Sequence, residues 1–251
     1  MKMFLKKLFI RKPKALNYEE RAEGKSPYMI VLHYTGMRTM EEAKARLKDP
    51  QSKVSAHYLV DEDGTVYNLV PEEKRAWHAG VSYWNRETDI NSVSIGIEIV
   101  NPGHEFGYQP FSQEQMYAVC CLCQEIKKRH NIKNVLGHSD VAPERKADPG
   151  EFFDWEYLAG EGVGLWPDIT PEDIEKGQEL SRNDFEAKRM FDLFGYNPIA
   201  AYVDVVTAFQ RHYYQKLFQE DSSRVGLACQ DTLTRLVALT RQRADRESKT
   251  L

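Results

Sequence analysis

Short β-rich runs alternate with helix-forming segments over residues 26–167, and this alternation constrains the fold more than any other feature of the sequence. Each run has the length of a strand and is rich in Val, Ile, Leu or Tyr. The runs are Tyr28–Tyr34, Ser55–Val60, Thr65–Leu69, Ser92–Val100 and Asn134–Gly137. The second and third runs are joined by the sequence DEDG, which is a hairpin signal because its glycine, Gly64, tolerates positive φ.

Two segments between the strands carry helix start signals. Thr39–Leu47 consists of helix formers behind a threonine N-cap. A longer helix, from Ser112 to about His130, opens with a capping box formed by Ser112 and Gln115. Strands mixed with helices in this way predict an α/β domain whose functional site lies on loops at the strand ends.

After the segment Pro167–Pro171 the strand signals stop. Three amphipathic segments follow at helical spacing and predict a separate small helical domain: Asp184–Leu193, Val203–Tyr214 and Asp231–Arg241. The expected organisation is therefore a basic leader over 1–25, the α/β domain over 26–167, a linker over 168–182, the helical domain over 183–243 and a charged tail over 244–251.

The composition restricts the partners. At 251 residues the chain can bury a large core, alone or with a small module. Its formal charge of -4 argues against a general polyanion binder, so no nucleic-acid partner is expected. No apolar run approaches the roughly 18 residues of a membrane span, so no transmembrane segment is expected. The sequence carries no signal for an oligomeric state.

Residues 1–14 contain six Lys or Arg and no acid, with Phe and Leu between them. Lys6 and Lys7 interrupt the apolar run that a secretory signal needs. We interpret the segment as a disordered basic leader, with an amphipathic arm for an anionic membrane surface as the alternative. Because no clear signal peptide is present, the chain as encoded is expected in the cytoplasm.

Three of the four cysteines, Cys120, Cys121 and Cys123, crowd into one expected helix, a poor layout for a disulfide framework. The pair Cys120 and Cys123 could form half a zinc knuckle or a redox pair. No second CxxC exists, however, and the neighbouring residues form an apolar stripe. Packing in the core is therefore the favoured interpretation.

The loop GHSDVAPERKADPG, residues 137–150, places His138, Lys146 and Asp148 close together in the sequence. If this loop folds back on itself, its imidazole and its carboxylate can reach one metal ion. A catalytic zinc site needs three protein ligands and an open position for water. His33, at the end of an apolar run, is the candidate for the third ligand.

The seven histidines differ in their surroundings. His33 and His138 each stand at the end of an apolar strand, where a rigid scaffold presents a side chain to a loop-built site. His57, in the strand SAHYLV, fits a structural or a functional role equally, and His78, on a Gly-flanked loop, could line a cleft. The remaining three sit among polar neighbours and are expected at the surface: His104, His130 and His212.

Glu98 interrupts an otherwise apolar strand, which is costly unless the carboxylate is paired or functional. Beside a zinc-bound water it could act as general base. Lys146, two residues before Asp148, could stabilise the oxyanion that develops during attack on a carbonyl. The alternative is a buried ion pair between Glu98 and Lys146 with no catalytic role.

Five blocks of the sequence resemble the type 2 N-acetylmuramoyl-L-alanine amidases, a family that includes the AmpD and AmiD amidases and the peptidoglycan recognition proteins. The blocks are VLHYTG, AHYLVDEDGTVYNLV, RAWHAGVSYWN, NSVSIGIEIVN and GHSDVAPERKADPG, in this order over residues 26–167. The resemblance is closest to the AmiD subgroup. It implies a mixed central β-sheet flanked by helices.

The resemblance also implies a zinc site made of His33, His138 and Asp148, with Glu98 as general base and Lys146 as transition-state stabiliser. Some relatives carry Cys at the third ligand position and Tyr in the AHY strand. Here these positions hold Asp148 and Ala56, which favours the mechanism with Glu and Lys. Trp77, His78 and Asn85 fall in the block that lines the cleft in the family, and Arg145 sits beside the ligand loop. The resemblance therefore assigns these four residues to substrate contact.

The implied substrate is peptidoglycan or a muropeptide, and the implied reaction is hydrolysis of the amide between the lactyl group of N-acetylmuramic acid and L-alanine. A catalytically silent peptidoglycan-binding or sensing protein is the alternative from another class, but no ligand is missing here. A zinc peptidase that cuts within the stem peptide is a third possibility, which the ligand set alone leaves open.

The segments VDVVTAFQRHYY and TLTRLVAL resemble the three-helix peptidoglycan-binding domain that often follows such amidases. The usual Asp-Gly turn before the last helix is replaced by DSSRVGLACQDTL. Glycan binding and a purely structural helical cap are both compatible with this pattern. A wall-binding module would favour the periplasm or cell envelope as the alternative compartment.

Overall fold

The computed structural model describes residues 10–11 and 14–248. These residues form two compact units. The first comprises the described residues up to Gly80 together with Asn91–Leu136, and the second comprises Val81–Ile90 and the described residues from Gly137 onward. No helix among the described residues is both long and apolar enough to cross a membrane.

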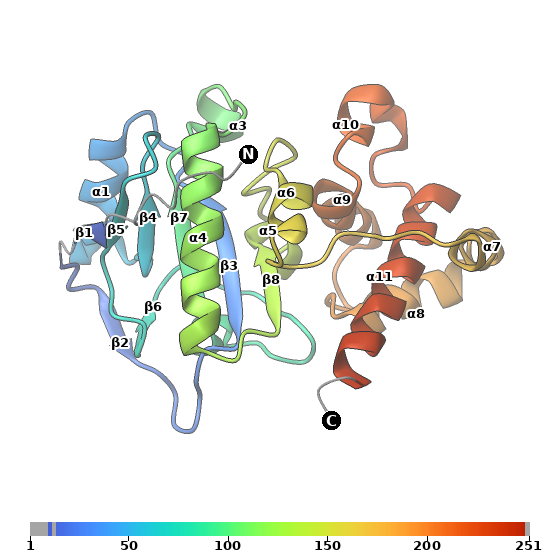
Figure 1. The fold of residues 1–251 in the computed structure, drawn as a ribbon, viewed down its shortest axis with the longest axis horizontal. Helices are drawn as coiled ribbons and strands as arrows, with labels where there is room; N and C mark the ends of the chain where they lie inside the picture. The colour runs from blue at the N-terminus through green and yellow to red at the C-terminus, as the bar shows by residue number, and fades with distance from the viewer. Residues whose placement is uncertain (1–9, 12–13, 249–251) are drawn as a thin grey trace. The chain divides into compact units, whose positions relative to one another are not determined.

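A mixed β-sheet forms the centre of the first unit (Figure 1). Its strand order is β1-β5-β4-β7-β3-β8, and a second, two-stranded sheet pairs β2 with β6. Strand β7 runs parallel to both β3 and β4, whereas β4 and β5 form the expected antiparallel hairpin. The strands are β1 Ile10–Arg11, β2 Tyr18–Glu20, β3 Met29–Tyr34, β4 Tyr58–Val60, β5 Val66–Asn68, β6 Lys74–Ala76, β7 Ser94–Ile99 and β8 Asn134–Gly137.

Helices begin where the sequence predicts them. The Thr39 side chain caps α1 (Met40–Lys48) by accepting from the backbone N–H of Glu42, and Ser112 and Gln115 form the capping box of α4 (Gln113–Arg129). Figure 1 shows α4 lying across the sheet. The other short helical segments before β8 are the 3-10 turn η1 Pro50–Ser52, α2 Ile90–Val93 and α3 Gly103–Phe106.

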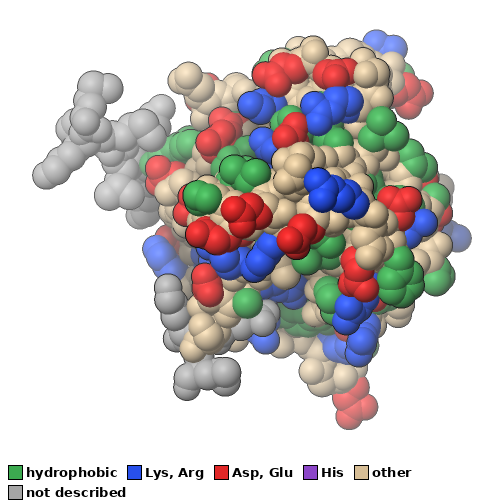
Figure 2. All heavy atoms as spheres, turned by 90° about the vertical axis from the view of Figure 1, so that its right-hand side faces the viewer, with side chains coloured by type: hydrophobic (Ala, Val, Ile, Leu, Met, Phe, Trp, Pro, Cys, Tyr) green, Lys and Arg blue, Asp and Glu red, His purple; other side chains and the backbone are tan. Residues whose placement is uncertain are grey.

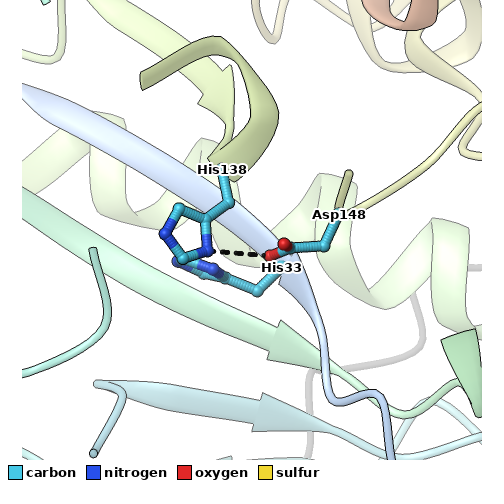
Figure 3. Close-up of side chains that lie close together, drawn as sticks. All are labelled: His33, His138 and Asp148. Carbon is cyan, nitrogen blue, oxygen red and sulfur yellow. Dashed lines mark hydrogen bonds and ion pairs between the residues drawn. The ribbon is translucent and has the colours of Figure 1, made fainter. Parts of the chain in front are cut away.

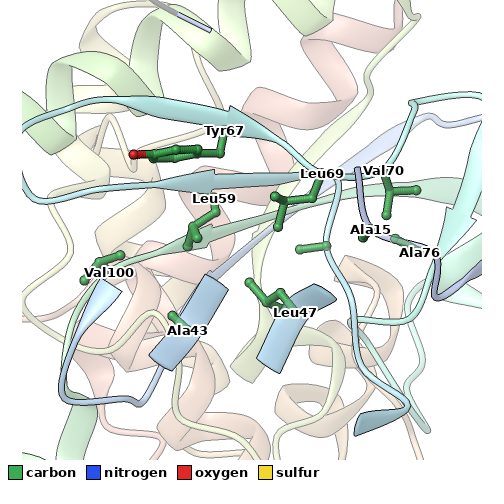
Figure 4. Packing of buried hydrophobic residues seen from close by; sticks show 10 residues of the cluster. Ala15, Ala43, Leu47, Leu59, Tyr67, Leu69, Val70, Ala76 and Val100 are labelled. Atoms are coloured by element: carbon green, nitrogen blue, oxygen red, sulfur yellow. The ribbon is translucent and has the colours of Figure 1, made fainter. Parts of the chain in front are cut away.

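Buried side chains on both helices join them to the sheet. Ala43 and Leu47, one turn apart on α1, belong to a core cluster with Leu59 of β4 (Figure 4). On α4, Cys120 and Cys123 are 3% and 0% exposed, and neither forms a disulfide. Burial raises the pKa of the Cys123 thiol, which disfavours the reactive thiolate. The expectation that these cysteines pack in the core is confirmed.

Residues 14–25, which the sequence assigned to a basic leader, take part in the first unit. Strand β2 pairs antiparallel with β6, and Ala15 is only 2% exposed. Arg21 donates to the carbonyl oxygens of Glu72 and Ser94. The first unit therefore begins before residue 26, because partners far along the chain hold this segment. The rest of the expected leader, residues 1–9 and 12–13, lies outside the described residues.

The second unit is helical over most of its length. Its helices are α5 His138–Val141, α6 Trp155–Gly160, α7 Pro171–Leu180, α8 Asp184–Phe194, α9 Tyr202–Tyr213, α10 Leu217–Glu220 and α11 Gln230–Ser248, with a 3-10 turn η2 at Ser222–Arg224. Helices α8, α9 and α11 match the three expected amphipathic segments. Helix α11 continues through residues that the sequence assigned to the tail.

Residues 168–182, expected as a linker, instead contain helix α7. Thr170 and Asp173 form its capping box, and Pro171 occupies its first turn. Gly177 lets α7 approach α11 closely, since a Cβ there would lie 2.2 Å from Oγ1 of Thr234. Arg241 of α11 donates to both carboxylate oxygens of Asp173, at 3.2 and 2.8 Å.

Aromatic side chains from α8, α9 and the turn between them form the core of the second unit. Those 2% exposed or less are Phe191, Phe194, Tyr196, Phe209 and Tyr213. On the molecular face drawn in Figure 2, acidic and basic side chains are interspersed, with apolar side chains between them. No single sign of charge dominates that face, in keeping with the small net charge of the chain.

Candidate metal centre and active site

Strand register places His33 and Glu98 on one face of the sheet. His33 of β3 lies directly opposite Glu98 of β7, and Leu59 of β4 lies opposite Glu98 on its other side. Residues directly opposite each other in a parallel pair point to the same face, and neighbouring strands are about 4.8 Å apart. His33 is 1% exposed, whereas Glu98 is half-buried. The carboxylate therefore emerges beside the imidazole near the carboxyl end of both strands.

His78 packs on the same strand and contacts His33. Its Nδ1 lies 3.1 Å from Nε2 of His33, and its Nε2 lies 3.2 Å from the hydroxyl of Ser94. Gly96 makes room for the ring, because a Cβ at that position would lie 2.4 Å from Cγ of His78. His78 is 8% exposed. It thus orients His33 through a hydrogen bond, and its assignment to substrate contact stays a prediction.

The loop after β8 carries the other two candidate ligands. His138 is the first residue of α5, and its Nδ1 lies 3.0 Å from Oδ2 of Asp148. The backbone N–H of Ser139 donates to the carbonyl oxygen of Asp148 at 2.9 Å, so the loop closes on itself. Both side chains are buried, at 4% and 5% exposure. The loop therefore folds back on itself, as binding of one metal ion by His138 and Asp148 requires.

His33, His138 and Asp148 form one cluster (Figure 3). One ligand-capable atom from each residue lies within 4.8 Å of those of the other two, and all three residues are buried. Two imidazoles and one carboxylate are a suitable donor set for a catalytic zinc ion, which keeps an open position. His33 also has a neighbouring hydrogen-bond partner, because its Nε2 lies 3.1 Å from Nδ1 of His78, and such a partner is typical of metal-binding histidines. The cluster therefore fits zinc.

The remaining loop residues have defined backbone positions. Lys146 is half-buried, and its backbone N–H donates to the carbonyl oxygen of Ala142 at 3.0 Å. Arg145 donates through Nε to the carbonyl oxygen of Val81 at 2.9 Å, and its Nη2 lies 3.4 Å from Nε2 of His138. The catalytic role of Lys146 and the substrate role of Arg145 stay predictions.

Trp77 and Asn85 also occupy defined positions. Trp77 is half-buried, and its backbone N–H donates to the hydroxyl of Ser55 at 2.9 Å. Asn85 is exposed and takes a left-handed backbone conformation with φ 49°. Its backbone N–H donates to the carbonyl oxygen of Gly195 at 2.7 Å. Their assignment to substrate contact stays a prediction.

His57, whose role the sequence left open, has a structural environment. Its Nδ1 accepts from the backbone N–H of Gly96 at 3.0 Å, so the ring proton sits on Nε2, 3.0 Å from the carbonyl oxygen of Lys74. The guanidinium of Arg21 lies 3.1 Å from the same nitrogen. Complete burial, reinforced by the positive charge of Arg21, lowers the pKa of His57 to about 3. The imidazole is therefore neutral in the folded protein.

A buried polar cluster around Asp140 of the ligand loop was not expected from the sequence. Asp140 is 0% exposed, and His212, expected at the surface, is 1% exposed. That surface prediction was wrong because the polar neighbours of His212 in the sequence do not include its partner, which lies 72 positions away. The only local signal was the position of Asp140, three residues after Gly137, where an acid can cap the start of a helix.

Comparison with known proteins identifies the family. The family model described as N-acetylmuramoyl-L-alanine amidase matches residues 23–151, about half of the chain. The chain is 34% identical over 227 residues to the N-acetylmuramoyl-L-alanine amidase AmiD of Escherichia coli strain K12, a match that covers 82% of this chain and 81% of that protein.

Two solved structures are similar over both units. The complex of E. coli AmiD with anhydro-N-acetylmuramic acid-L-Ala-D-gamma-Glu-L-Lys has a TM-score of 0.73 and 31% identity, and covers 89% of this chain and 93% of that chain. AmpDh3 of Pseudomonas aeruginosa with an anhydromuramic pentapeptide has a TM-score of 0.74 and 31% identity, with 86% and 92% covered. The site geometry, the family match and the near full-length similarity agree. This chain belongs to the N-acetylmuramoyl-L-alanine amidase family.

Proposed function

We propose that this protein is a zinc-dependent amidase that hydrolyses the bond between the lactyl group of N-acetylmuramic acid and L-alanine of the stem peptide. The observation that carries the proposal is the buried cluster of His33, His138 and Asp148, in a chain of the amidase family. Its donor set suits zinc better than magnesium or calcium, which prefer oxygen ligands only.

The residues of the site divide the chemical work. When zinc is bound, it supplies a Lewis acid that polarises the substrate carbonyl and lowers the pKa of water. Glu98, beside His33 on the sheet, accepts the proton of the attacking water and passes it to the departing amine of L-alanine. The ammonium of Lys146, near Asp148 in the loop, stabilises the negative charge that develops on the carbonyl oxygen.

The substrate is a muropeptide or peptidoglycan. The two solved relatives are named as complexes with anhydromuramic peptides, and their similarity to this chain is nearly full-length. We assign Trp77, His78 and Asn85 to substrate contact because they fall in the block that lines the cleft in the family, and Arg145 because it lies beside the ligand loop. Both muropeptides with intact muramic acid and those with its 1,6-anhydro form should be tested as substrates.

Mass spectrometry of a muropeptide digest tests the function. The protein as purified should release intact stem peptides that begin at L-alanine, chelation should abolish this release, and added zinc should restore it. Cleavage inside the stem would make the protein a peptidase. Tightly bound zinc without any cleavage would favour the binding-protein alternative.

Glu98→Gln tests the assigned base. The amide keeps the shape of the side chain but cannot accept a proton, so turnover should fall by about 10²- to 10⁴-fold while zinc stays bound. Glu125→Gln is the matched control, since Glu125 is a surface residue of α4 paired with Lys128. Near wild-type turnover of Glu98→Gln would contradict the mechanism.

A further inference from the structure

The carboxylate of Asp140 is the centre of a buried hydrogen-bond cluster in the second unit. Its Oδ2 accepts from the backbone N–H of Gly137 and lies 2.7 Å from Nδ1 of His212, while its Oδ1 accepts from the hydroxyl of Tyr196 at 2.7 Å. Asp140 and His212 are 0% and 1% exposed. A buried carboxylate is costly unless hydrogen-bond donors surround it. Here two of the three donors, His212 and Tyr196, come from the C-terminal helical region, which we define as helices α7 to α11, residues 171–248.

This carboxylate fixes the start of the loop that carries two candidate zinc ligands. Gly137, held by Asp140, directly precedes His138 at the start of α5. The next residue, Ser139, donates its backbone N–H to the carbonyl oxygen of Asp148. A shift of Asp140 would therefore move both His138 and Asp148.

His212 is placed to serve Asp140. Its ring stacks on Trp155, with centroids 3.7 Å apart and planes 23° apart, and on Tyr213 with centroids 3.7 Å apart. Its Nε2 is buried with no hydrogen-bond partner in the described part of the chain. Burying an unsatisfied ring nitrogen is unfavourable, so other interactions must compensate for it. These are the bond of Nδ1 to Asp140 and the stacking on Trp155 and Tyr213.

The same helical region holds the ligand loop and its continuation at further points. The backbone N–H of Ala201, just before α9, donates to Oε1 of Glu144 at 3.2 Å. Arg211 of α9 pairs with Glu151 at 3.4 Å, and Gln215, after α9, donates to the carbonyl oxygen of Glu151 at 2.9 Å. Residues of α9 and its flanks thus contact the ligand loop at Glu144, between His138 and Asp148, and again at Glu151, just after Asp148.

We propose that the C-terminal helical region is a positioning element of the metal centre, in which His212 and Tyr196 act through Asp140 to hold His138 and Asp148 in ligand geometry. This inference rests on the proposed zinc function and assigns the region a role other than glycan binding. His212, Tyr196 and Asp140 are positioning residues, since none of them is a metal ligand.

The test compares zinc affinity in full-length variants, measured by competition with a chelator well below the unfolding temperature. His212→Ala should weaken zinc binding by about tenfold or more, the loss typical of residues that orient metal ligands. His212→Asn, whose amide N–H can occupy the position of Nδ1–H, should recover part of the affinity. Tyr196→Phe removes only the hydroxyl that donates to Asp140, so the variant should fold and lose less zinc affinity than His212→Ala.

Leu236→Ala is the matched control. Leu236 is fully buried in α11, which packs on α7 and α8, so its truncation should lower the unfolding temperature without changing zinc affinity. Unchanged zinc affinity in folded His212→Ala and Tyr196→Phe would overturn the inference. An equal loss of affinity in Leu236→Ala would also overturn it, because the effect would then be general destabilisation.

The two proposals fail in different ways. If the wild-type protein binds zinc and releases stem peptides while His212→Ala keeps full affinity, only the positioning role is lost. If the wild-type protein binds no zinc, the proposed function fails, and the positioning role fails with it.

Discussion

Replacing His57 with asparagine should remove an acid-sensitive contribution to the stability of the protein. In the folded protein Nδ1 of His57 accepts from the backbone N–H of Gly96, and Arg21 lies beside Nε2. Protonation would turn Nδ1 into a donor facing another donor, next to a guanidinium. Asparagine keeps an acceptor for Gly96 but does not titrate. The difference in stability between two pH values should therefore change.

The magnitude follows from the two pKa values of His57. The folded value of about 3 lies below the unfolded value of 6.5, so the unfolded state binds the proton more readily. The contribution to stability is complete above the unfolded pKa and is lost as the pH falls from there toward the folded pKa. At pH 5.5, one unit below the unfolded pKa, the loss is about 1.4 kcal/mol relative to pH 7.5.

Urea unfolding at these two pH values measures the effect. Metal-free protein is required, because loss of zinc from His33 and His138 would add its own pH dependence. Wild type should lose about 1.4 kcal/mol more than His57→Asn between the two pH values. His57→Gln should share the smaller pH dependence of His57→Asn even if its absolute stability differs. If both variants lost as much as wild type, the folded protein would not hold His57 neutral.

Two further predictions follow from the site. Gly96→Ala would place a Cβ 2.4 Å from Cγ of His78, so it should lower the free energy of unfolding by about 1–3 kcal/mol and weaken zinc binding. Thermal unfolding and competition with a chelator measure the two effects. Unchanged stability and zinc affinity would mean that His78 can move aside without cost. Zinc should be released as the pH falls below neutrality, because protons compete for His33 and His138. Metal analysis after dialysis checks this, and constant zinc content down to strongly acidic pH would contradict a site with two histidine ligands.

Much of the first unit was predictable because its signals are local. Thr39 and Ser112 mark helix starts through side chains that bond within three residues, and Gly64 marks a hairpin between adjacent strands. The strand ends at His33 and His138 drew attention to the ligands for the same reason. Glu98 and Lys146 stood out from the residues alone, with a non-catalytic ion pair as the alternative, and the family blocks favour their catalytic roles, which stay predictions.

The errors fall where the stabilising partner is distant in the sequence. The sequence predicts a linker in place of helix α7 because apolar residues are few there. Contacts of Gly177 and Asp173 with α11, more than 50 positions away, stabilise the helix. Arg21 was assigned to a leader, yet its acceptors lie 51 and 73 positions away.

The sequence by itself determined most helices and strands of the first unit, the identity of the candidate ligands and the family, since these depend on residue types at short spacing. Only the tertiary structure decided that His78 supports His33, that His57 is neutral and structural, and that His212 lies buried against Asp140. Each of these depends on which distant group the fold brings within hydrogen-bond distance of an imidazole. Because an imidazole can donate, accept or carry charge, its neighbours in space decide its role, and residue type alone does not.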